Sequence, residues 1–310
     1  TFLPHSVMKK LRIYKDSLGV INEYKPDVIL FHGAAAYELM RVAEYKKYHP
    51  NVKLYVDSHE DFNNSARSFL SKQVLHRLLY KRCIKRVLNY IEKVLCVSME
   101  AFEFMRDFYG IPSEKLEFYP LGGTVIEGNE KVNRKMKIRN ELNLRDTDML
   151  FVHSGKMNKA KQTIEILKAF KRVSSDRLRL VLLGSISEDI NEELMLLINN
   201  DNRVNFLGWK NAEELKNYLC AADMYLQPGS QSATLQNAIC CGCPVMIYLH
   251  KSYEPFFKGN GFLVETIEDM TKIFETVDNN PEILRKMGEA SYMVAYELLD
   301  YRKLAARLYK

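Results

Sequence analysis

The chain has 310 residues, of which 47% are hydrophobic and 27% charged, a balance typical of a globular protein of two ordinary domains. It contains no run of 18 apolar residues, so we expect no transmembrane helix. It shows no signal-peptide pattern and begins with Thr1, so we expect that the natural start is missing. The formal net charge is +6, and residues 68–96 alone carry seven Lys and Arg against Glu92.

The predicted elements of the first part alternate between short apolar runs and segments of helical spacing. Strands are predicted at 27–31, 53–57, 93–97 and 116–120, and helices at 34–47, at about 66–91 and after Ser98, which is placed to cap a helix. The polar segment of about 124–148 is predicted to be a linker between domains.

The second part repeats this alternation. Strands are predicted at 149–153, 178–183, 204–207 and 224–227, and helices at about 162–173, 192–199, 212–221 and 287–309. Apolar strands that alternate with helices indicate parallel sheets covered on both faces. We therefore predict two doubly wound α/β domains, each with its ligand site at the carboxyl ends of its strands. No dinucleotide or Walker fingerprint and no solenoid repeat is present.

Six cysteines occur, and three of them lie within residues 240–243. A metal site would need a second ligand cluster at a suitable spacing, and the sequence offers none. We expect these thiols to pack as small buried hydrophobes in a reducing cytoplasm. The six are Cys83, Cys96, Cys220, Cys240, Cys241 and Cys243.

Residues 227–245 give the clearest functional signal, because a predicted strand end is followed there by a loop of small residues and a short helix. Such a loop presents backbone N–H groups and the positive end of a helix to an anion, and a diphosphate is the natural guest. A plain helix N-cap is the alternative interpretation.

Several segments, in the correct order, resemble family 4 glycosyltransferases of the GT-B fold, also called group 1. They are Lys25-Pro-Asp-Val-Ile-Leu-Phe-His-Gly33, Val94-Leu-Cys-Val-Ser98, Tyr119-Pro-Leu-Gly-Gly123, Ser154-Gly-Lys-Met-Asn-Lys-Ala-Lys161, Val204-Asn-Phe-Leu-Gly-Trp209, Ala221-Ala-Asp-Met-Tyr-Leu-Gln-Pro228 and Ala238-Ile-Cys-Cys-Gly-Cys-Pro-Val245. The resemblance begins late, since only about 24 residues precede the first segment. We expect an N-terminal truncation or an unusually short acceptor domain.

The resemblance implies two Rossmann-like domains that face each other across a cleft. The acceptor-side domain would be residues 1–124, joined by the last helix at 289–310, and the donor-binding domain would be residues 125–288. The implied reaction moves a sugar from a nucleoside-diphosphate donor to a saccharide or lipid-linked acceptor, with retention of configuration, without a metal and without any other cofactor. Bacterial surface polysaccharide assembly in the cytoplasm is the implied setting.

Lys156 and Lys161 match the basic pair that holds the donor diphosphate in the family. Negative charge develops on the β-phosphate as the sugar leaves, and a fixed cation offsets it. Lys in place of Arg keeps the charge and loses the bidentate fork. Gly155 would let the backbone approach the donor, and a solvated basic loop is the alternative.

The family carries two glutamates eight positions apart, and here those positions hold Gly229 and Asn237. Asn237 can still hydrogen-bond a ribose hydroxyl, whereas Gly229 has no side chain, so that Gln231 or a backbone group would replace it. The other donor-binding residues implied by the resemblance are Ser230, Ser232, Thr234, Leu235, Gly208 and Trp209. For Trp209 the sequence favours core packing over stacking on the base.

His59 is the catalytic candidate at the end of the 53–57 strand, where the family places a His or Asp against the donor sugar. Glu60 would orient His59 or assist an acceptor, and the alternative is a helix-capping cluster. His32 and Gly33, at the end of the 27–31 strand, are further acceptor-side candidates, and a structural His is equally compatible with His32.

The basic stretch 68–96 interleaves Lys and Arg with Leu, Val and Ile. A solvated helix face is the first interpretation, contact with acidic lipid at the inner leaflet is the second, and nucleic acid is the least favoured. The functional alternatives are a weak or non-enzymatic relative that binds a nucleotide sugar or a partner protein, and a nucleotide-sugar epimerase. No carboxylate pair is placed for epimerase chemistry.

Overall fold

The computed structural model describes residues 12–14, 16–62 and 71–309, and the chain forms two compact units. The N-terminal unit comprises Thr1–Pro120 together with Ala305–Lys310, and the C-terminal unit comprises Leu121–Leu304. Most of the C-terminal helical region therefore groups with the C-terminal unit. Among the described residues, no helix combines the length and the apolar character needed to cross a membrane.

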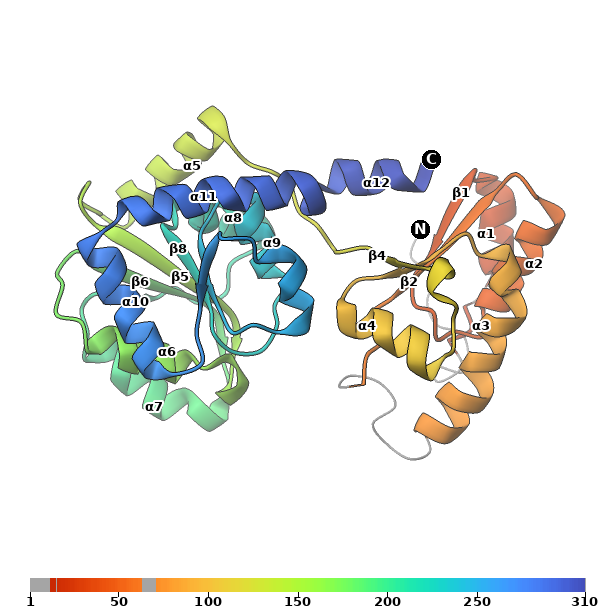
Figure 1. Ribbon diagram of the computed structural model, residues 1–310, viewed down its shortest axis with the longest axis horizontal. Coiled ribbons are helices and arrows are strands. Elements are labelled where there is room, and N and C mark those ends of the chain that lie inside the picture. Colours follow the sequence, from red (N-terminus) through yellow and green to blue (C-terminus); the bar gives the residue numbers. More distant parts are fainter. Residues whose placement is uncertain (1–11, 15, 63–70, 310) are drawn as a thin grey trace. The chain divides into compact units, whose positions relative to one another are not determined.

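A four-stranded parallel sheet forms the centre of the N-terminal unit, in the order β1-β2-β3-β4 (Figure 1). Its strands are β1 (Val28–Phe31), β2 (Lys53–Ser58), β3 (Val94–Cys96) and β4 (Leu116–Phe118). Its described helical segments are α1 (Ser17–Tyr24), α2 (Leu39–Tyr48), η2 (Ser71–Tyr80), α3 (Lys81–Val87), η3 (Leu88–Tyr90), α4 (Met99–Glu103), η4 (Phe104–Phe108) and η5 (Ser113–Lys115). Strand β3 is buried throughout, as expected of a parallel strand covered on both faces.

Two helix predictions in this unit can be compared with the structure. Ser98 caps α4, because its Oγ accepts a hydrogen bond from the Ala101 backbone N–H at 3.0 Å, as predicted. The helix predicted at 66–91 is present from residue 71 as the π-helix η2, which continues into α3 and η3, while positions 66–70 lie outside the described residues.

The C-terminal unit has a six-stranded parallel sheet in the order β10-β9-β8-β5-β6-β7. Its strands are β5 (Met149–Met157), β6 (Leu178–Ile186), β7 (Val204–Phe206), β8 (Met224–Gln227), β9 (Val245–Ile247) and β10 (Gly261–Leu263). Its helical segments are α5 (Gly128–Glu141), η6 (Lys159–Lys161), α6 (Thr163–Lys171), α7 (Glu188–Asn199), α8 (Ala212–Ala221), α9 (Thr234–Cys240), η7 (Lys251–Phe256), α10 (Ile267–Asn279), α11 (Glu282–Val294) and η8 (Ala295–Leu299). Helix α12 (Tyr301–Tyr309) follows and ends in the N-terminal unit.

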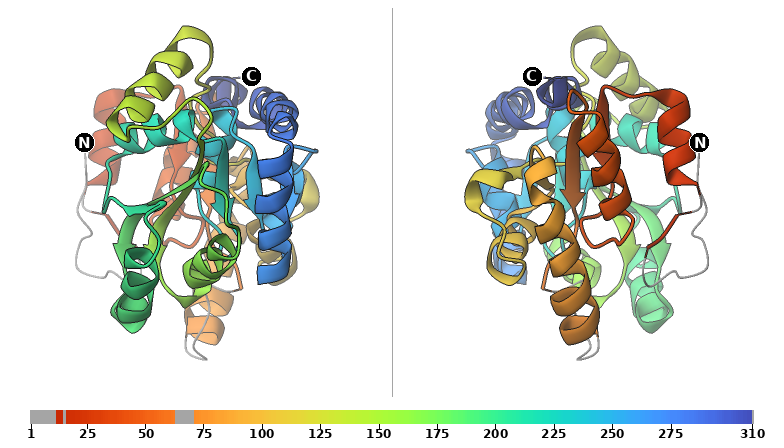
Figure 2. Two further views of the ribbon diagram at one scale, coloured as in Figure 1. Left: turned by 90° about the vertical axis from the view of Figure 1, so that its left-hand side faces the viewer. Right: turned by 90° about the vertical axis from the view of Figure 1, so that its right-hand side faces the viewer.

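Helices cover both faces of this sheet, as Figures 1 and 2 show. Helices α6, α7 and α10 pack together on one face, and α5, α8, α9 and α11 lie on the other. The fold prediction of two parallel-sheet α/β domains is therefore confirmed. All six cysteines are buried and free, also as predicted.

The predicted linker at 124–148 is largely helical, because Gly128–Glu141 forms α5 and packs against α8. Only Ile138 of this helix is buried, so the sequence lacks the apolar stripe that announces a helix. Polar contacts hold it instead. Arg134 donates to Asn217 Oδ1 at 2.7 Å, and Lys135 pairs with Asp223 at 3.2 Å. The helix predicted at 287–309 is interrupted, because the backbone of Asp300 is extended.

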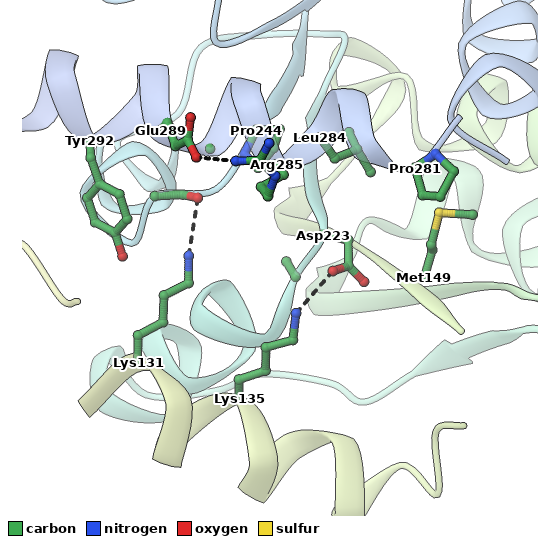
Figure 3. Close-up of a pocket in the computed structure, with 13 residues that line it drawn as sticks. Lys131, Lys135, Met149, Asp223, Pro244, Pro281, Leu284, Arg285, Glu289 and Tyr292 are labelled. Atoms are coloured by element: carbon green, nitrogen blue, oxygen red, sulfur yellow. Dashed lines mark hydrogen bonds and ion pairs between the residues drawn. The ribbon is translucent and has the colours of Figure 1, made fainter. Parts of the chain in front are cut away.

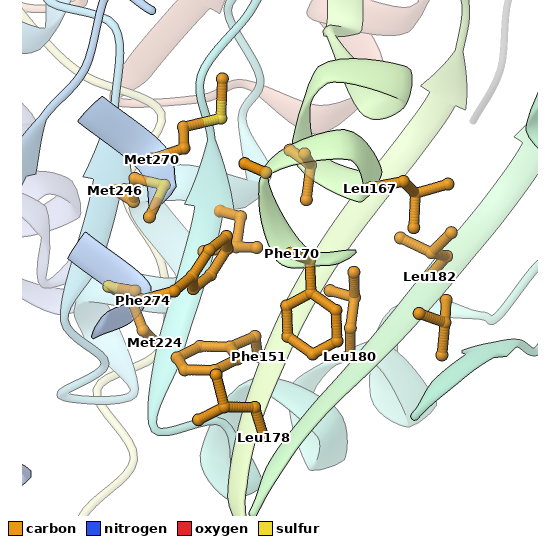
Figure 4. Packing of buried hydrophobic residues seen from close by; sticks show 14 of the residues in the cluster. Phe151, Leu167, Phe170, Leu178, Leu180, Leu182, Met224, Met246, Met270 and Phe274 are labelled. Atoms are coloured by element: carbon orange, nitrogen blue, oxygen red, sulfur yellow. The ribbon is translucent and has the colours of Figure 1, made fainter. Parts of the chain in front are cut away.

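An apolar core between the sheet and α6, α7 and α10 stabilises the C-terminal unit (Figure 4). At its centre are the fully buried rings of Phe151, Phe170 and Phe274, with centroids 5.2–6.2 Å apart and edge-to-face geometry. Such pairs add to the free energy gained by burying the rings. These ring contacts hold helices α6 and α10 against β5, whose carboxyl end belongs to the candidate site described below.

Phe274→Ala should lower the free energy of unfolding of the C-terminal unit by about 3–5 kcal/mol, because it leaves a cavity among packed rings. Urea denaturation followed by circular dichroism measures the change. Met293→Ala, at a side chain that is 73% exposed, is the control and should change stability little. Equal effects of the two substitutions would contradict this account of the core.

Candidate functional site at the β5 and β8 strand ends

The chain order of the C-terminal sheet reverses between β5 and β8, because β6 and β7 add on one side of β5 and β8 on the other. The carboxyl ends of strands at such a reversal are where open α/β sheets bind ligands. The buried His153 of β5 connects β8 and α6 at this point. Its Nδ1 donates to Leu226 O of β8 at 2.8 Å, and its Nε2 accepts from the Thr163 hydroxyl of α6 at 3.0 Å. Burial lowers the pKa of His153 to about 4, so the ring is neutral. The role of His153 could not be predicted from the sequence, because a lone His within an apolar strand resembles a core residue.

Lys161 ends the turn between β5 and α6, and its side chain is folded under the loop that follows β8. Its Nζ donates to Ser230 O at 3.1 Å and to Gln231 O at 3.0 Å. Burial lowers the pKa of this ammonium group to about 8. Lys156, at the end of β5, is instead exposed. The two lysines therefore have different environments, and only Lys161 is built into the site.

Three glycines bring backbone close together beside this lysine. Gly155 and Gly184 are paired in the β5–β6 register with φ of +128° and +133°, and a Cβ on Gly184 would meet Gly155 O at 1.9 Å. Gly208 O accepts the Gly184 N–H at 2.8 Å. At Gly184 no other residue type could allow this approach.

A cavity of about 220 Å³ opens at these glycines. It brings together three residues predicted for donor binding, Gly155, Trp209 and Thr234. Trp209 is 76% exposed, so the favoured expectation of core packing was wrong. The remaining lining residues are Ser154, Leu183, Gly184, Lys210, Ala212 and Leu215.

The β8–α9 loop is fixed by hydrogen bonds to its neighbours. The Ser230 N–H donates to Ala160 O at 2.7 Å, and the Ser232 N–H donates to the Tyr253 hydroxyl at 2.7 Å. Leu235 is fully buried and its N–H donates to Ser232 O, so its side chain faces the core. Asn237 is partly exposed on α9, a helix of seven residues. Of the predicted donor-binding residues in this segment, Ser230 and Gln231 contact the Lys161 ammonium, each through its backbone carbonyl oxygen.

Close backbone packing explains why position 229 holds a glycine rather than the glutamate of the family pattern. A Cβ on Gly229 would lie 2.3 Å from Ala160 O and 2.6 Å from the carbonyl carbon of Lys161. The β8–α9 loop lies so close to the η6 backbone that no side chain fits. The close packing of the two loops therefore accounts for the missing glutamate.

In the N-terminal unit, the candidates His32, Gly33 and His59 meet around Asp57, at the carboxyl ends of β1 and β2. Asp57 Oδ2 lies 2.8 Å from His32 Nδ1 and 3.6 Å from His59 Nε2, and Asp57 Oδ1 accepts the Gly33 N–H at 2.7 Å. These hydrogen bonds outweigh burial and lower the pKa of Asp57, while Asp57 raises the pKa of His59. The role of Asp57 could not be predicted from the sequence, because Asp57 is predicted there only as the last residue of a strand.

Glu60 was the sequence-based candidate to orient His59, and the structure gives it different partners. Its carboxylate is buried, accepts the Ser58 hydroxyl at 3.0 Å and pairs with Arg12 at 2.9 Å. Asp57 is therefore the carboxylate that contacts His59.

His32, Asp57 and His59 are also the described residues that could hold a metal ion, since their ligand atoms all lie within 4.8 Å of one another. Ligands of a tetrahedral zinc ion are roughly 3.3 Å apart. The 2.8 Å contact of His32 with Asp57 is instead a hydrogen-bond distance. The arrangement as it stands is a hydrogen-bonded cluster.

A further cavity, of about 390 Å³, lies at the opposite ends of the strands, beside Met149 and Pro244 (Figure 3). Its cations already have partners: Lys131 donates to Gly242 O at 3.2 Å, Lys135 pairs with Asp223 and Arg285 pairs with Glu289. This cavity is remote from the switch point and offers an anion no uncommitted charge.

Solved structures share the two-unit architecture. HepE of Anabaena, solved in complex with UDP, is similar over 94% of this chain and 80% of its own, with a TM-score of 0.68 and 16% identity. A glycosyltransferase of Rickettsia africae is similar over 93% and 76%, with a TM-score of 0.70 and 15% identity. Together with the two parallel sheets, these likenesses define a protein of the GT-B fold.

The family follows from the sequence of the C-terminal unit. The model described as "Glycosyl transferases group 1" matches residues 134–294, which is more than half of the chain. The protein belongs to this family. An uncharacterized 41.2 kDa protein in the cps region of Klebsiella pneumoniae is 25% identical over 213 residues, which cover 64% of this chain and 57% of that relative.

Asp57→Asn should lower the pKa of the His59 imidazole, because the hydrogen bond to Asp57 is the largest cause of its elevation. NMR titration of the histidine ring protons, assigned with a His59→Gln variant, measures the shift. Asp27→Asn removes the same charge just before β1, at the far end of that strand, and should leave His59 unchanged. A His59 pKa that is the same in wild type and Asp57→Asn would contradict this account of the cluster.

Proposed function

We propose that this protein is a glycosyltransferase that moves a sugar from a nucleoside-diphosphate donor to a saccharide or lipid-linked acceptor. The observation that carries the proposal is the Lys161 ammonium, held by Ser230 O and Gln231 O at the β5–β8 switch point. Family membership supports the reaction class. The nearby cavity of about 220 Å³, with its exposed Trp209, suits the nucleoside.

The chemistry follows from where charge develops. Cleavage of the bond between the sugar and the β-phosphate leaves negative charge on the phosphate oxygens, and a preorganised cation in a partly dry site stabilises that charge strongly. Lys161 supplies the cation, so the diphosphate needs no metal ion and the protein no other cofactor. We further propose that configuration is retained and that His59, held by Asp57, hydrogen-bonds the sugar.

Two relatives support the biological setting. The Klebsiella pneumoniae relative is described from a cps region, and HepE of Anabaena was solved with UDP and with UDP-glucose. We propose a role in surface polysaccharide assembly on the cytoplasmic side of the membrane, with a nucleotide sugar as donor.

The second candidate is a weak or non-enzymatic relative that binds a nucleotide sugar or a partner protein. It is favoured by Gly229, where the backbone contact with Ala160 leaves no room for an acidic side chain. Multiple-turnover transfer to a lipid-linked acceptor separates the two candidates. Binding without any turnover would favour the second.

Lys161→Met should weaken the binding of the nucleoside diphosphate by about 1.5–3 kcal/mol, because it removes one charge-assisted contact. Isothermal titration calorimetry of the full chain with UDP, GDP and ADP measures this change. Lys156→Met, at the exposed lysine near the end of β5, is the matched control and should have a smaller effect. Equal affinity in wild type and Lys161→Met would contradict the phosphate assignment.

The pH dependence of the same titration provides a second check. Below about pH 8 the Lys161 ammonium is charged, and above it the charge is progressively lost. Affinity should therefore fall as the pH rises through 8 in the wild type and stay flat over that range in Lys161→Met.

We also propose that the basic stretch contacts acidic lipid. Arg77, Arg82, Lys85 and Arg86 are exposed on η2 and α3. Burial lowers the pKa of Lys81 on the same helix, and repulsion from Lys85 and Arg77 lowers it further. A surface of this kind is attracted to anionic headgroups by about 1 kcal/mol per basic residue.

Arg82→Glu combined with Arg86→Glu should therefore reduce binding to vesicles of phosphatidylcholine and phosphatidylglycerol by roughly 30-fold or more. Co-sedimentation measures it, and binding should weaken with added salt. Arg285→Glu combined with Lys286→Glu on α11 makes the same charge change in the C-terminal unit. An equal loss in this control pair would show that net charge alone is responsible, and it would contradict the proposal that the basic stretch contacts the lipid.

A further inference from the structure

Two cavities are lined by residues close to Lys161, which itself lines neither. The first is the one of about 220 Å³ that Gly155 and Trp209 line. A Cβ on Gly155 would lie 4.0 Å from Lys161 Nζ, so this cavity adjoins the charge. The second has about 280 Å³ and is lined by Ala160, Gln162, Pro228, Gly229, Ser230, Tyr248 and His250. It contains both chain neighbours of Lys161 and also Ser230, whose carbonyl oxygen accepts from its Nζ.

This arrangement corresponds to the shape of a nucleotide sugar, which carries one bulky group at each end of a diphosphate. If Lys161 holds the diphosphate, each end has a cavity within reach. The first cavity has an exposed indole, which suits the flat base. The second is then left for the sugar.

The surface of the second cavity is mainly apolar, and its walls carry no fixed charge. None of the described residues that line it is Lys, Arg, Asp or Glu. It offers the amide of Gln162, the ring of Tyr248, which is 40% exposed, and the imidazole of His250. The two rings lie 5.0 Å apart in an edge-to-face arrangement, and His250 Nε2 donates to Gly229 O at 2.9 Å. Aromatic surface with a few placed hydrogen-bonding groups is typical of small-molecule sites.

Two backbone features shape the second cavity. Gly229 contributes no side chain, because a Cβ there would collide with Ala160 O. Gln162 has φ of +55°, in the left-handed region where glycine is normally found. A residue other than glycine is strained in this conformation, and such strain is concentrated at functional positions.

We infer that the second cavity is the subsite for the sugar of the donor and that it selects an uncharged pyranosyl group over a hexuronate. The inference rests on the proposed nucleotide-sugar function. A carboxylate placed there would lose its water without gaining a cation from the cavity walls, whereas sugar hydroxyls can exchange water for the Gln162 amide. Glycine in place of the family's glutamate at position 229 thus bears on which donor sugar the protein binds.

The test is calorimetry of the full chain with UDP, UDP-glucose and UDP-glucuronate, and with GDP, GDP-mannose and GDP-mannuronate. We expect the hexose donor to bind more tightly than the nucleotide alone, and the hexuronate donor to bind more weakly than the hexose. A hexuronate that binds as well as the hexose would overturn the inference. Failure of both UDP and GDP to bind would instead contradict the proposed function beneath it.

Gln162→Gly isolates the sugar subsite, because glycine tolerates the backbone conformation. It should reduce the affinity for the hexose donor roughly threefold to tenfold, as the loss of one hydrogen bond implies, and leave the affinity for the nucleotide unchanged. Asn143→Gly, at another residue of positive φ (+50°) outside the cavity, is the matched control and should change neither. Equal losses for hexose donor and nucleotide in Gln162→Gly would overturn the assignment.

Gln162→Lys provides a gain of function that misfolding cannot imitate. It places a cation in the cavity and should raise the affinity for the hexuronate relative to the hexose, the reverse of the wild-type preference. An unchanged ratio, with nucleotide binding intact, would show that the sugar lies elsewhere.

Discussion

The hydrogen bonds from the Lys161 ammonium to Ser230 O and Gln231 O are the constraint on which the candidate site depends. They join the turn after β5 to the loop after β8, two segments that meet only because the sheet order reverses there. A buried cation without a counter-ion is unfavourable, as its lowered pKa records. In the proposed function, a bound diphosphate would supply the missing negative charge and make the buried cation favourable.

Close backbone approach is the second constraint, and it accounts for both the geometry and the chemistry of the site. Gly184 touches Gly155 on one side of the lysine, and Gly229 touches Ala160 on the other. Both contacts exclude side chains. The surroundings of Lys161 are therefore formed by main chain and small residues, and in the proposed function specificity would come from groups farther out, such as Trp209 and Gln162. A departure from the family pattern at one position is thus a consequence of how two loops pack.

Much of the fold could be predicted because alternating apolar runs and helical segments encode parallel sheets directly. Helix α5 could not, since a helix with one buried residue and many charges has no apolar stripe to detect. Lys161 was found through a motif, whereas Asp57 and His153 were missed because their roles arise only when neighbouring strands place partners beside them. Trp209 was misjudged because an aromatic side chain after a strand is more often part of a core than the edge of a cavity.

The two units use a charged group in opposite ways. In the C-terminal unit a cation is buried against neutral carbonyl groups, which lowers its pKa and leaves it short of negative charge. In the N-terminal unit the Asp57 carboxylate is satisfied by His32, His59 and the Gly33 N–H, which stabilises its charge and favours protonated His59. The first arrangement suits a group that waits for an anion. The second suits a group that holds its hydrogen-bond donors in fixed positions whether or not a substrate is bound.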